Sequence, residues 1–418
     1  MVTEMFDETW IIVVLFWFSV SFILYAYAGY PFLLWILSLF RKAGPGNKGT
    51  NRLPHVSLII SAYNEERVIE SKILNSLELD YPKEMLEVVI VSDASTDETD
   101  RIVLQHSDPR IKLRRFEGHI GKTACLNKAV PLAMGEVIVF SDANSQYEKF
   151  AIRHLAKWFE DKAVGFVTGR TEYISCQGTD SFSSTGLYTQ IERYVKVLES
   201  KISSCVGADG AIFAIRKNLY QMLQDYDIND LVIPLKIVGQ GYRGVFEEAA
   251  YCFEESAGSA QGEFRRHTRI TARSLRAIFN HVGLLNPFKY PLFSFQLLSH
   301  KLIRFLVPFA VLLALFLNIS IVLMGGGIAY ITTFALQVLF YVLWGFGYFE
   351  IKLPLATRAA SFANTFFVVN LAILIGWVQY LRGETYTTWS TSRQNKTGNT
   401  LQKLEADPMP KKKELARP

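Results

Sequence analysis

Two long uncharged runs constrain this chain more than any other feature. Trp10 to Phe40 holds no charged residue over 31 positions, and Phe305 to Phe349 holds none over 45. A helix needs about 20 apolar residues to cross a bilayer, so the first run predicts a single long, tilted or kinked helix with Pro31 inside it. The second run is interrupted by Gly325-Gly-Gly327 and predicts two helices joined by a tight hairpin. Ala359 to Leu381 is a further candidate span of 23 residues.

The positions of Lys and Arg predict the orientation, because cytoplasmic flanks carry an excess of both. Four basic residues follow the first run between positions 41 and 52, which places the next region in the cytoplasm. With three C-terminal spans, the basic tail from Arg382 onward would lie outside, whereas the same rule places it inside. Either Ala359 to Leu381 is re-entrant or the rule fails at the last helix. We expect four true spans and leave the side of the tail open.

The charge balance excludes one class of partner and favours another. A net charge of +5 over 418 residues is too small to indicate nucleic-acid binding. Basic residues gather at 265–276, 301–304 and 411–413, which suggests contact with anionic lipid headgroups. Apolar residues recur at helical spacing beside the first cluster, so this segment is predicted to be an amphipathic helix in the membrane interface. A surface helix packed on the soluble domain is the alternative.

Residues 54–270 alternate between strand and helix signals. This β-α-β-α-β order predicts a parallel sheet with right-handed crossovers. The pattern loosens after Val164–Gly169, and Tyr242–Phe246 is predicted to be the last strand. The other predicted strands are Val56–Ser61, Glu87–Asp93, Ile111–Phe116 and Glu136–Ser141, and the predicted helices are Glu65–Leu77, Asp97–Gln105, Thr123–Ala133 and Phe150–Phe159.

Three aspartates in this region suggest its chemistry. Asp93 and Asp142 each end a short apolar strand, and Asp230 follows Asn229. The carboxyl ends of parallel strands face the crevice where α/β sheets bind ligands. Carboxylates brought together there, beside membrane spans, predict nucleotide-dependent chemistry on a substrate that the membrane holds or exports.

Six short segments match the motifs of one family, in order and at suitable spacing. The chain resembles the membrane-bound inverting glycosyltransferases of family 2, a group that includes cellulose, hyaluronan and poly-N-acetylglucosamine synthases. The resemblance covers roughly residues 54–280, and the flanking membrane layout fits it. The matching segments are Ser61-Ala-Tyr-Asn-Glu-Glu66, Val91-Ser-Asp93-Ala-Ser-Thr-Asp97, Gly121-Lys122-Thr-Ala-Cys-Leu-Asn127, Ser141-Asp142-Ala-Asn144, Gly207-Ala-Asp-Gly210 and Asn229-Asp230.

The resemblance implies an α/β GT-A fold, a Rossmann-like mixed sheet, in a cytoplasmic domain inserted between transmembrane helices of a bacterial-type inner or plasma membrane. Four spans are few for a channel within one chain, so export of a polymer would need a homo-oligomer or an export partner. The expected layout is a transmembrane helix in 1–45, the GT-A domain in 50–270, the interfacial helix and C-terminal membrane helices in 271–385, and a polar, disordered tail in 386–418.

The resemblance also implies a role for each matching residue. Asp230 corresponds to the catalytic base, which takes the proton of an acceptor hydroxyl as it attacks the anomeric carbon. Asp142 and Asn144 correspond to a metal-binding Asp-x-Asp signature, so Mg²⁺ or Mn²⁺ is the expected cofactor. The residues expected to bind the nucleotide-sugar donor are Tyr63, Asn64, Glu65, Asp93, Lys122, Asp142 and Arg266, and those expected to bind the acceptor are Gly207, Asp209 and His267.

These residues also have structural interpretations. Asp93 and Asp142 suit turn carboxylates, and Glu65 suits the first turn of a helix. Lys122 suits a solvated surface, and Asp230 suits the cap of the helix that begins after it.

The chain departs from the family pattern at three places. Asn144 stands where a second carboxylate is usual, which predicts weaker metal affinity, and Asn229 replaces a glutamate. Processive members carry Gln-x-x-Arg-Trp, whereas the corresponding stretch here is Glu263-Phe-Arg-Arg266-His267. In the family the tryptophan forms a platform under the terminal acceptor sugar, and an imidazole offers less stacking surface. This departure argues against long-chain processivity and leaves sugar transfer in place.

Two activities stay open at this point. The first is a polysaccharide synthase that elongates a β-linked glycan from a UDP-sugar; the C-terminal hairpin and Trp389-Ser-Thr-Ser-Arg393, similar to a Trp-Thr-Arg stretch in synthases, favour it. The second is transfer of a single sugar to a lipid or lipid-linked acceptor, which His267 favours. An inactive nucleotide-sugar-binding subunit fits poorly with the retention of all three aspartates. The segment after the first strand has no glycine, which argues against a dinucleotide oxidoreductase.

Overall fold

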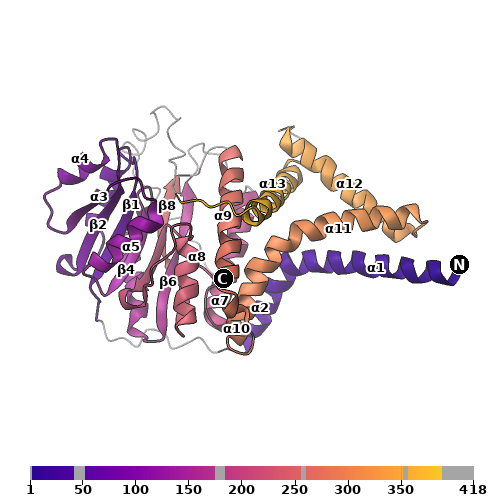
Figure 1. Ribbon diagram of the computed structural model, residues 1–418, viewed down its shortest axis with the longest axis horizontal. Coiled ribbons are helices and arrows are strands. Elements are labelled where there is room, and N and C mark those ends of the chain that lie inside the picture. The colour runs from indigo at the N-terminus through magenta and orange to yellow at the C-terminus, as the bar shows by residue number, and fades with distance from the viewer. Residues whose placement is uncertain are drawn as a thin grey trace, which may run out of the picture.

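The computed structural model describes residues 2–41, 52–174, 184–255, 260–349, 351 and 356–387. An α/β domain forms one end of the molecule, and long apolar helices extend from it on the other side (Figure 1). The segment from 388 onward, with Trp389–Arg393 and most of the predicted tail, lies outside the described residues, as do the basic residues at 42–51 that bear on orientation.

A mixed eight-stranded sheet organises the α/β domain, with the strand order β3-β2-β1-β4-β7-β6-β8-β5. The first four strands in this order are parallel, as the alternating pattern predicts. β7 pairs antiparallel with both of its neighbours, β4 and β6, which makes the sheet mixed. The strands are β1 (Val56–Ala62), β2 (Leu86–Asp93), β3 (Ile111–Phe116), β4 (Val137–Asp142), β5 (Gln146–Tyr147), β6 (Val164–Ile174), β7 (Ile212–Arg216) and β8 (Arg243–Glu255).

Helices cover both faces of this sheet. Four 3₁₀ turns connect the elements at Lys83–Met85, Lys157–Glu160, Lys217–Leu219 and Val282–Leu285. The helices of the domain are α3 (Ile69–Leu77), α4 (Thr99–Leu104), α5 (Lys122–Leu132), α6 (Ala151–Ala156), α7 (Ser184–Ile202), α8 (Asn229–Gly239) and α9 (Ala260–Asn280).

Each face of the sheet has its own apolar core, because successive side chains of a strand point to opposite faces. In β1, Ile59 packs in the cluster that contains residues of α5 and α8. Its neighbours Leu58 and Ile60 pack in the cluster that contains residues of α3 and α6. β1 and β2 are buried along their whole length, which explains why they appear in the sequence as continuous apolar runs.

The strand predictions are right for the parallel half of the sheet and incomplete beyond it. β7 was not predicted, and β6 and β8 run further than Val164–Gly169 and Tyr242–Phe246. The added part of β8 pairs with Arg170–Ile174 of β6 and carries several charged residues. Such polar strands lack the apolar pattern of a buried strand. They form because β6 and β8 pair with each other in the folded sheet.

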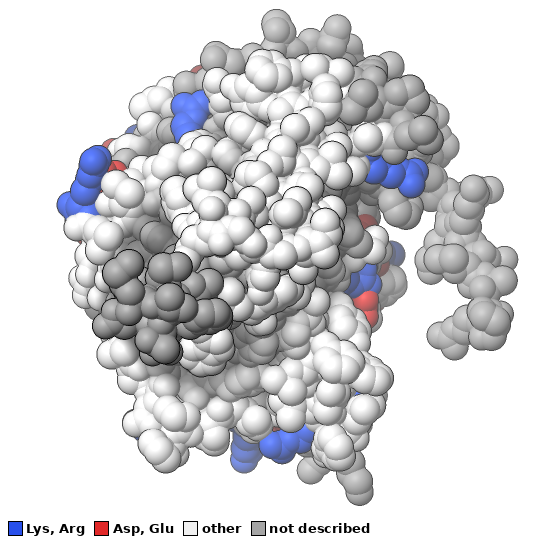
Figure 2. Space-filling view, turned by 90° about the vertical axis from the view of Figure 1, so that its right-hand side faces the viewer, with Lys and Arg blue, Asp and Glu red and all other residues white. Residues whose placement is uncertain are grey.

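In the described part of the chain, four helices are long and apolar enough to cross a membrane. Figure 2 views the molecule from the side toward which they extend, and the few charged side chains on its described surface lie toward the rim. The predicted single N-terminal helix is present as α1 (Val2–Leu24), a π-helical turn η1 (Tyr25–Gly29) and α2 (Tyr30–Leu39). The second candidate span begins at Pro291, before the predicted Phe305, and consists of α10 (Pro291–Leu297), a π-helical turn η6 (Leu298–Leu302) and α11 (Ile303–Leu323); α12 (Ile328–Tyr348) and α13 (Thr357–Leu381) follow.

The basic helix α9 packs against α13 instead of lying free. Thr268, Thr271 and Ser274 on one face of α9 are buried, and Gly376 of α13 lies directly against Thr271. Contact of α9 with lipid headgroups stays a prediction for its exposed residues such as Arg265.

Gly376→Ala should destabilise the protein, because a Cβ at this position would lie 2.7 Å from Cβ of Thr271. Overpacking of this kind costs about 1–3 kcal/mol. Thermal unfolding in lipid nanodiscs measures the effect. Gly345→Ala is the matched control, since a Cβ on Gly345 of α12 meets nothing within 4 Å. Equal melting temperatures for the two variants would contradict the close α9–α13 contact.

Candidate functional site

The carboxyl ends of three parallel strands bring the predicted residues to one edge of the sheet. In the register of the sheet, Ser61 of β1 lies opposite Asp142 of β4, and Ala62 lies opposite Ser92, the residue before Asp93. Neighbouring strands lie about 4.8 Å apart, so Asp93 and Asp142 flank the end of β1. The prediction that these two aspartates share a crevice edge is consistent with this register.

Asp93 organises the turn before α5. Its carboxylate is 1% exposed, and its Oδ2 accepts a hydrogen bond from the backbone N–H of Gly121 at 2.9 Å. The same oxygen lies 3.1 Å from Nδ1 of His119. Asp93 is therefore a structural anchor of the His119–Lys122 turn as well as a candidate base-binding group.

An aromatic pair lies directly after the carboxyl end of β1. The rings of Tyr63 and His119 stack with their centroids 3.9 Å apart. Asn64, Ala94 and His119 all have positive φ, a conformation that costs non-glycine residues energy and clusters at functional sites. The two rings form a flat surface suited to stacking on a nucleobase.

The side chains of Asn64 and Glu65 lie in the same turn. Oδ1 of Asn64 accepts a hydrogen bond from the backbone N–H of Thr96 at 2.8 Å. The backbone N–H of Glu65 donates to Oγ1 of Thr99 at 2.8 Å. Both residues thus join the loops that follow β1 and β2, and their contact with a nucleotide stays a prediction.

Lys122 and Asp142 form an ion pair at the sheet edge, with Nζ 2.5 Å from Oδ1. Lys122 is the first residue of α5, where backbone N–H groups also favour an anion. The ammonium therefore occupies one lone-pair direction of the carboxylate that was predicted to hold a metal.

The oxygen donors at this edge fit a hard divalent cation. Mg²⁺ and Mn²⁺ prefer carboxylate and amide oxygens and keep several ligands for water and phosphate. Asp142 and the half-buried Asn144 supply such oxygens on one turn. Within the described residues no three His, Cys, Asp or Glu side chains are grouped to hold a metal. A metal here would rest on Asp142, Asn144 and the phosphates of its substrate.

Lys72 lies behind this turn and was not predicted. Its side chain is fully buried, its Nζ donates to the backbone carbonyl of Ser145 at 2.5 Å, and the same atom lies 4.0 Å from the ring centroid of Tyr147. Burial lowers the pKa of Lys72 to about 7. Oγ of Ser145 in turn donates to Glu254 at 2.5 Å, and burial together with Asp142 raises the pKa of that carboxyl. The turn that carries Asp142 and Asn144 is thus held by the buried side chain of Lys72 and by the carboxyl of Glu254.

The lowered pKa of Lys72 predicts a pH dependence of stability. Between about 7 and 10.5 the unfolded chain keeps a proton on this lysine that the folded protein has lost. Stability then rises with pH across that window, because the unfolded state binds more protons. The melting temperature of the wild type relative to Lys72→Met should therefore increase from pH 6 to pH 9. Lys162→Met, at an exposed lysine, is the control and should show no such trend.

Asp230 lies in the first turn of α8, and one of its side-chain oxygens is buried. Its Oδ1 and the Nδ2 of Asn229 are buried and have no hydrogen-bond partner among the described residues. Burial raises the pKa of Asp230, while Lys122 and Arg273 oppose the rise. An unpaired carboxylate with raised proton affinity is what a general base requires.

A small-residue loop covers Asp230. The N–H of Ala208 donates to the backbone carbonyl of Asp230 at 2.8 Å, and a Cβ on Gly210 would lie 3.0 Å from its Oδ2. Asp209 uses its carboxylate to accept from the N–H and the hydroxyl of Thr171. Asp209 therefore ties the loop to β6, and the acceptor contacts expected of Gly207 and Asp209 stay predictions.

Arg273 was assigned to a lipid-facing cluster, and the structure places it at the site. Its Nε donates to the carbonyl of Tyr226 at 3.1 Å, and its Nη2 donates to the carbonyl of Asp227. Burial lowers its pKa to about 10, while the charge of Asp230 acts in the opposite direction. Only the packing of α9 on the domain shows this role, because the sequence pattern shows only a basic helix.

Arg266 and His267 lie on the same helix, further from Asp230. Nη2 of Arg266 lies 3.5 Å from the hydroxyl of Tyr173, and its Nη1 lies 3.5 Å from Glu263. Nε2 of His267 lies 3.8 Å from Glu263. The predicted acceptor platform at His267 is therefore a partly exposed imidazole paired with a carboxylate.

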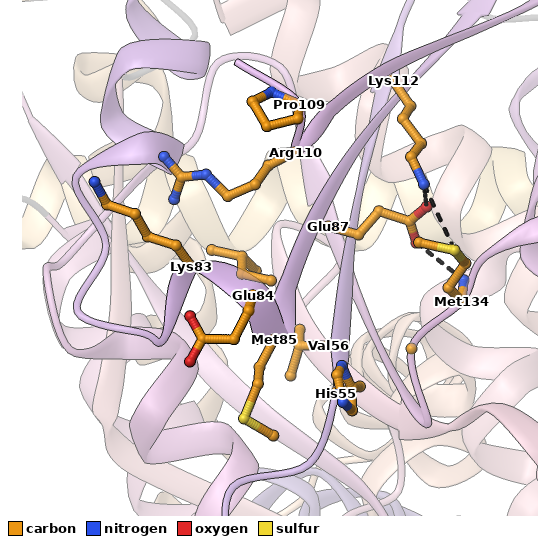
Figure 3. A pocket seen from close by; sticks show the side chains of 12 residues that line it. His55, Val56, Lys83, Glu84, Met85, Glu87, Pro109, Arg110, Lys112 and Met134 are labelled. Carbon is orange, nitrogen blue, oxygen red and sulfur yellow. Dashed lines mark hydrogen bonds and ion pairs between the residues drawn. The ribbon is translucent and has the colours of Figure 1, made fainter.

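A separate hollow of about 260 Å³ opens at the other edge of the sheet (Figure 3). It lies at the amino ends of β1 and β2 and is lined by residues such as His55, Lys83 and Arg110. Glu87 faces Lys112 and Met134 there and accepts hydrogen bonds from both. These contacts satisfy its carboxylate, and none of the predicted site residues lines this hollow.

The fold and the carboxylate edge define the class of the domain, and comparison with known proteins defines the family. Residues 57–222 match the model of "Glycosyl transferase family 2". The α/β domain of this chain thus matches the family 2 glycosyltransferases in sequence over these residues.

Curated relatives and one solved structure extend the comparison. The Bacillus subtilis protein named as a glycosyltransferase, YdaM, is 28% identical over 231 residues, which is 52% of this chain and 54% of that protein. The β-monoglucosyldiacylglycerol synthase of Nostoc sp. is 36% identical over 122 residues, which is 28% of this chain and 26% of that protein. The mannosyltransferase PcManGT from Pyrobaculum calidifontis, in complex with GDP-Man and Mn²⁺, has a TM-score of 0.66 at 22% identity, over 88% of this chain and 99% of that chain.

These likenesses confirm the predicted family and the GT-A fold. The fold of PcManGT extends over nearly the whole described chain, including helices beyond the α/β domain. The chain spans about half the length of the first curated relative and about a quarter of the second.

Proposed function

We propose that this protein transfers a sugar, with inversion, from a nucleoside diphosphate sugar to an acceptor held at a membrane. Asp230 is the observation that carries the proposal: a half-buried carboxylate with a raised pKa, whose buried Oδ1 has no hydrogen-bond partner in the described part of the chain, near the ion pair of Lys122 and Asp142. The four candidate spans support an acceptor at a membrane, and the cytoplasmic side follows from the basic flank of the first run.

The residues of the site divide the reaction between them. Tyr63 and His119 stack on the base, and Asp93 accepts hydrogen bonds from its N–H groups. Lys122 balances the diphosphate as it leaves. Asp230 takes the proton of the acceptor hydroxyl while that oxygen attacks the anomeric carbon, so a single displacement inverts the linkage. A divalent ion held by Asp142 and Asn144 would supply further positive charge to the diphosphate.

We favour a lipid or lipid-linked acceptor that receives one sugar. His267 offers an imidazole paired with Glu263 where a processive enzyme needs an aromatic platform. The Nostoc relative is named for glucosyl transfer to diacylglycerol, which supports this acceptor class. The second candidate is elongation of a β-linked polysaccharide, which the segment Trp389–Arg393 favours.

A transfer assay tests both candidates. Purified protein in lipid nanodiscs is incubated with Mn²⁺ or Mg²⁺ and a panel of radiolabelled UDP- and GDP-sugars, and the organic phase is separated from polymer. Label in the organic phase supports the lipid acceptor, and label in high-molecular-weight material supports the synthase. No transfer with any donor, despite tight nucleotide binding, would refute the proposed activity.

His267→Trp should lengthen the product if stacking of the acceptor limits processivity. An indole adds aromatic area on which a bound sugar can stack. The distribution of product lengths, measured in the same assay, reports the effect. His267→Phe separates ring size from hydrogen bonding. Product lengths that stay the same in both variants would contradict the platform role of position 267.

A further inference from the structure

A buried polar network joins the α/β domain to the apolar helices. Its centre is Glu199 of α7, which is 0% exposed. Its Oε1 accepts from the hydroxyl of Tyr30 at 2.6 Å and lies 2.8 Å from Nδ1 of His300. Tyr30 begins α2 and His300 lies in η6, so one carboxylate oxygen holds two candidate membrane spans (Figure 1 shows α2, α7 and α10 meeting at this junction).

A second carboxylate, Glu192, belongs to this network. Glu192, two turns earlier on α7, lies 3.1 Å from Nε2 of His300 and pairs with Arg304. His300 thus presents both ring nitrogens to carboxylate oxygens, an arrangement that an imidazolium satisfies at both ends. Polar groups buried among membrane helices are costly and mark functional positions.

The helices are locally distorted where they meet Glu199. The turns Tyr25–Gly29 and Leu298–Leu302 are both π-helical, and the hydroxyl groups of Tyr25 and Ser299 lie 2.8 Å apart between them. Single π-helical turns are uncommon and occur often at functional sites. Here one turn directly precedes Tyr30 and the other contains His300, the two side chains that bind Glu199.

The other oxygen of Glu199 leads to the catalytic base. Its Oε2 accepts from the backbone N–H of Val206 at 3.3 Å. Two residues later, the N–H of Ala208 donates to the backbone carbonyl of Asp230. The two spans are therefore connected to Asp230 in three steps. Their side chains bind Glu199, Glu199 binds the N–H of Val206, and the backbone of the loop at 206–210 leads to the hydrogen bond between Ala208 and Asp230.

We infer that Glu199 is a positioning residue that sets the loop at 206–210, and through it Asp230, at a defined depth relative to the membrane helices. The inference rests on the proposed function, because an acceptor held in a bilayer must meet the base at a fixed height. A soluble nucleotide sugar has no such requirement. Glu199 should therefore affect turnover of the acceptor and leave donor binding unchanged.

Glu199→Gln tests this role, and Glu192→Gln is the matched control. Both variants remove one charge from the same network on the same helix, but Glu192 has no contact with the loop at 206–210 among the described residues. Tyr30→Phe, which removes only the hydroxyl from the span, is the second variant if Glu199→Gln fails to fold. Hydrogen–deuterium exchange of the peptide covering 203–212 in nanodiscs is measured together with kcat and the donor KM.

In Glu199→Gln we expect the amides of Val206 and Ala208 to exchange about tenfold faster, and kcat to fall about tenfold, because the loss of a charge-assisted hydrogen bond is worth about 1.5 kcal/mol or more. The donor KM should stay within about twofold, and Glu192→Gln should leave both readouts near wild type. Equal behaviour of the two variants, or a change in donor KM alone, would overturn the inference. Wild-type protein that transfers no sugar while its loop still responds to Glu199→Gln would refute the proposed function instead.

Discussion

Asp230→Asn should lower sugar transfer by about 10²–10⁴-fold, because an amide cannot take the proton of the acceptor hydroxyl. Binding of the nucleotide sugar should stay near the wild-type level, since the asparagine keeps the shape of the buried side chain. Transfer is measured by product formation and binding by calorimetry. Asp225→Asn is the control: Asp225 is exposed, lies in the segment just before α8, and its substitution should leave both quantities unchanged. Equal losses of binding and turnover in Asp230→Asn would refute the assignment of the base.

The raised pKa of Asp230 adds a pH test to this prediction. The ionised form is the active base, and a raised pKa means that this form is populated only at higher pH than for an ordinary aspartate. The rate kcat/KM should therefore fall on the acid side at a pH above the usual aspartate range. A profile that stays flat down to pH 4 would contradict a buried Asp230 as the titrating base.

Asp142→Asn should remove most metal-dependent transfer and weaken donor binding. The variant loses the carboxylate that pairs with Lys122 and is expected to hold the cation. Removing one charged ligand from such a site typically costs more than tenfold in metal affinity or activity. The metal concentration for half-maximal transfer, titrated with Mn²⁺, is the measurement.

Asn144→Asp is the complementary variant at the same turn. It restores a second carboxylate, so half-maximal transfer should require less Mn²⁺ than in the wild type. If neither Asp142→Asn nor Asn144→Asp changes the metal requirement, this turn does not hold the metal. Lys122→Met distinguishes the contribution of the lysine from that of the metal ion, because it removes the ammonium and keeps the oxygen donors of Asp142 and Asn144.

Local patterns predicted the parts of this structure that depend on near neighbours in the chain. Uncharged runs of sufficient length specified the four candidate spans, and short apolar runs specified β1, β2 and β4. Because parallel strands present their carboxyl ends together, the sequence predicts that Asp93 and Asp142 lie at one edge of the sheet. Asp230 does not end a predicted strand, and only the family resemblance predicted its role.

Only the tertiary structure decided which partners the charged residues have. A basic helix looks the same in sequence whether its arginines face lipid or protein carbonyls, and Arg273 faces the carbonyls beside Asp230. Lys72 and Glu199 occupy helical positions of ordinary polar appearance, yet both are buried because distant segments supply their hydrogen-bond partners. Periodicity thus determined which segments are buried, and long-range packing determined what each buried charge contacts, since those contacts join residues more than 70 positions apart in sequence.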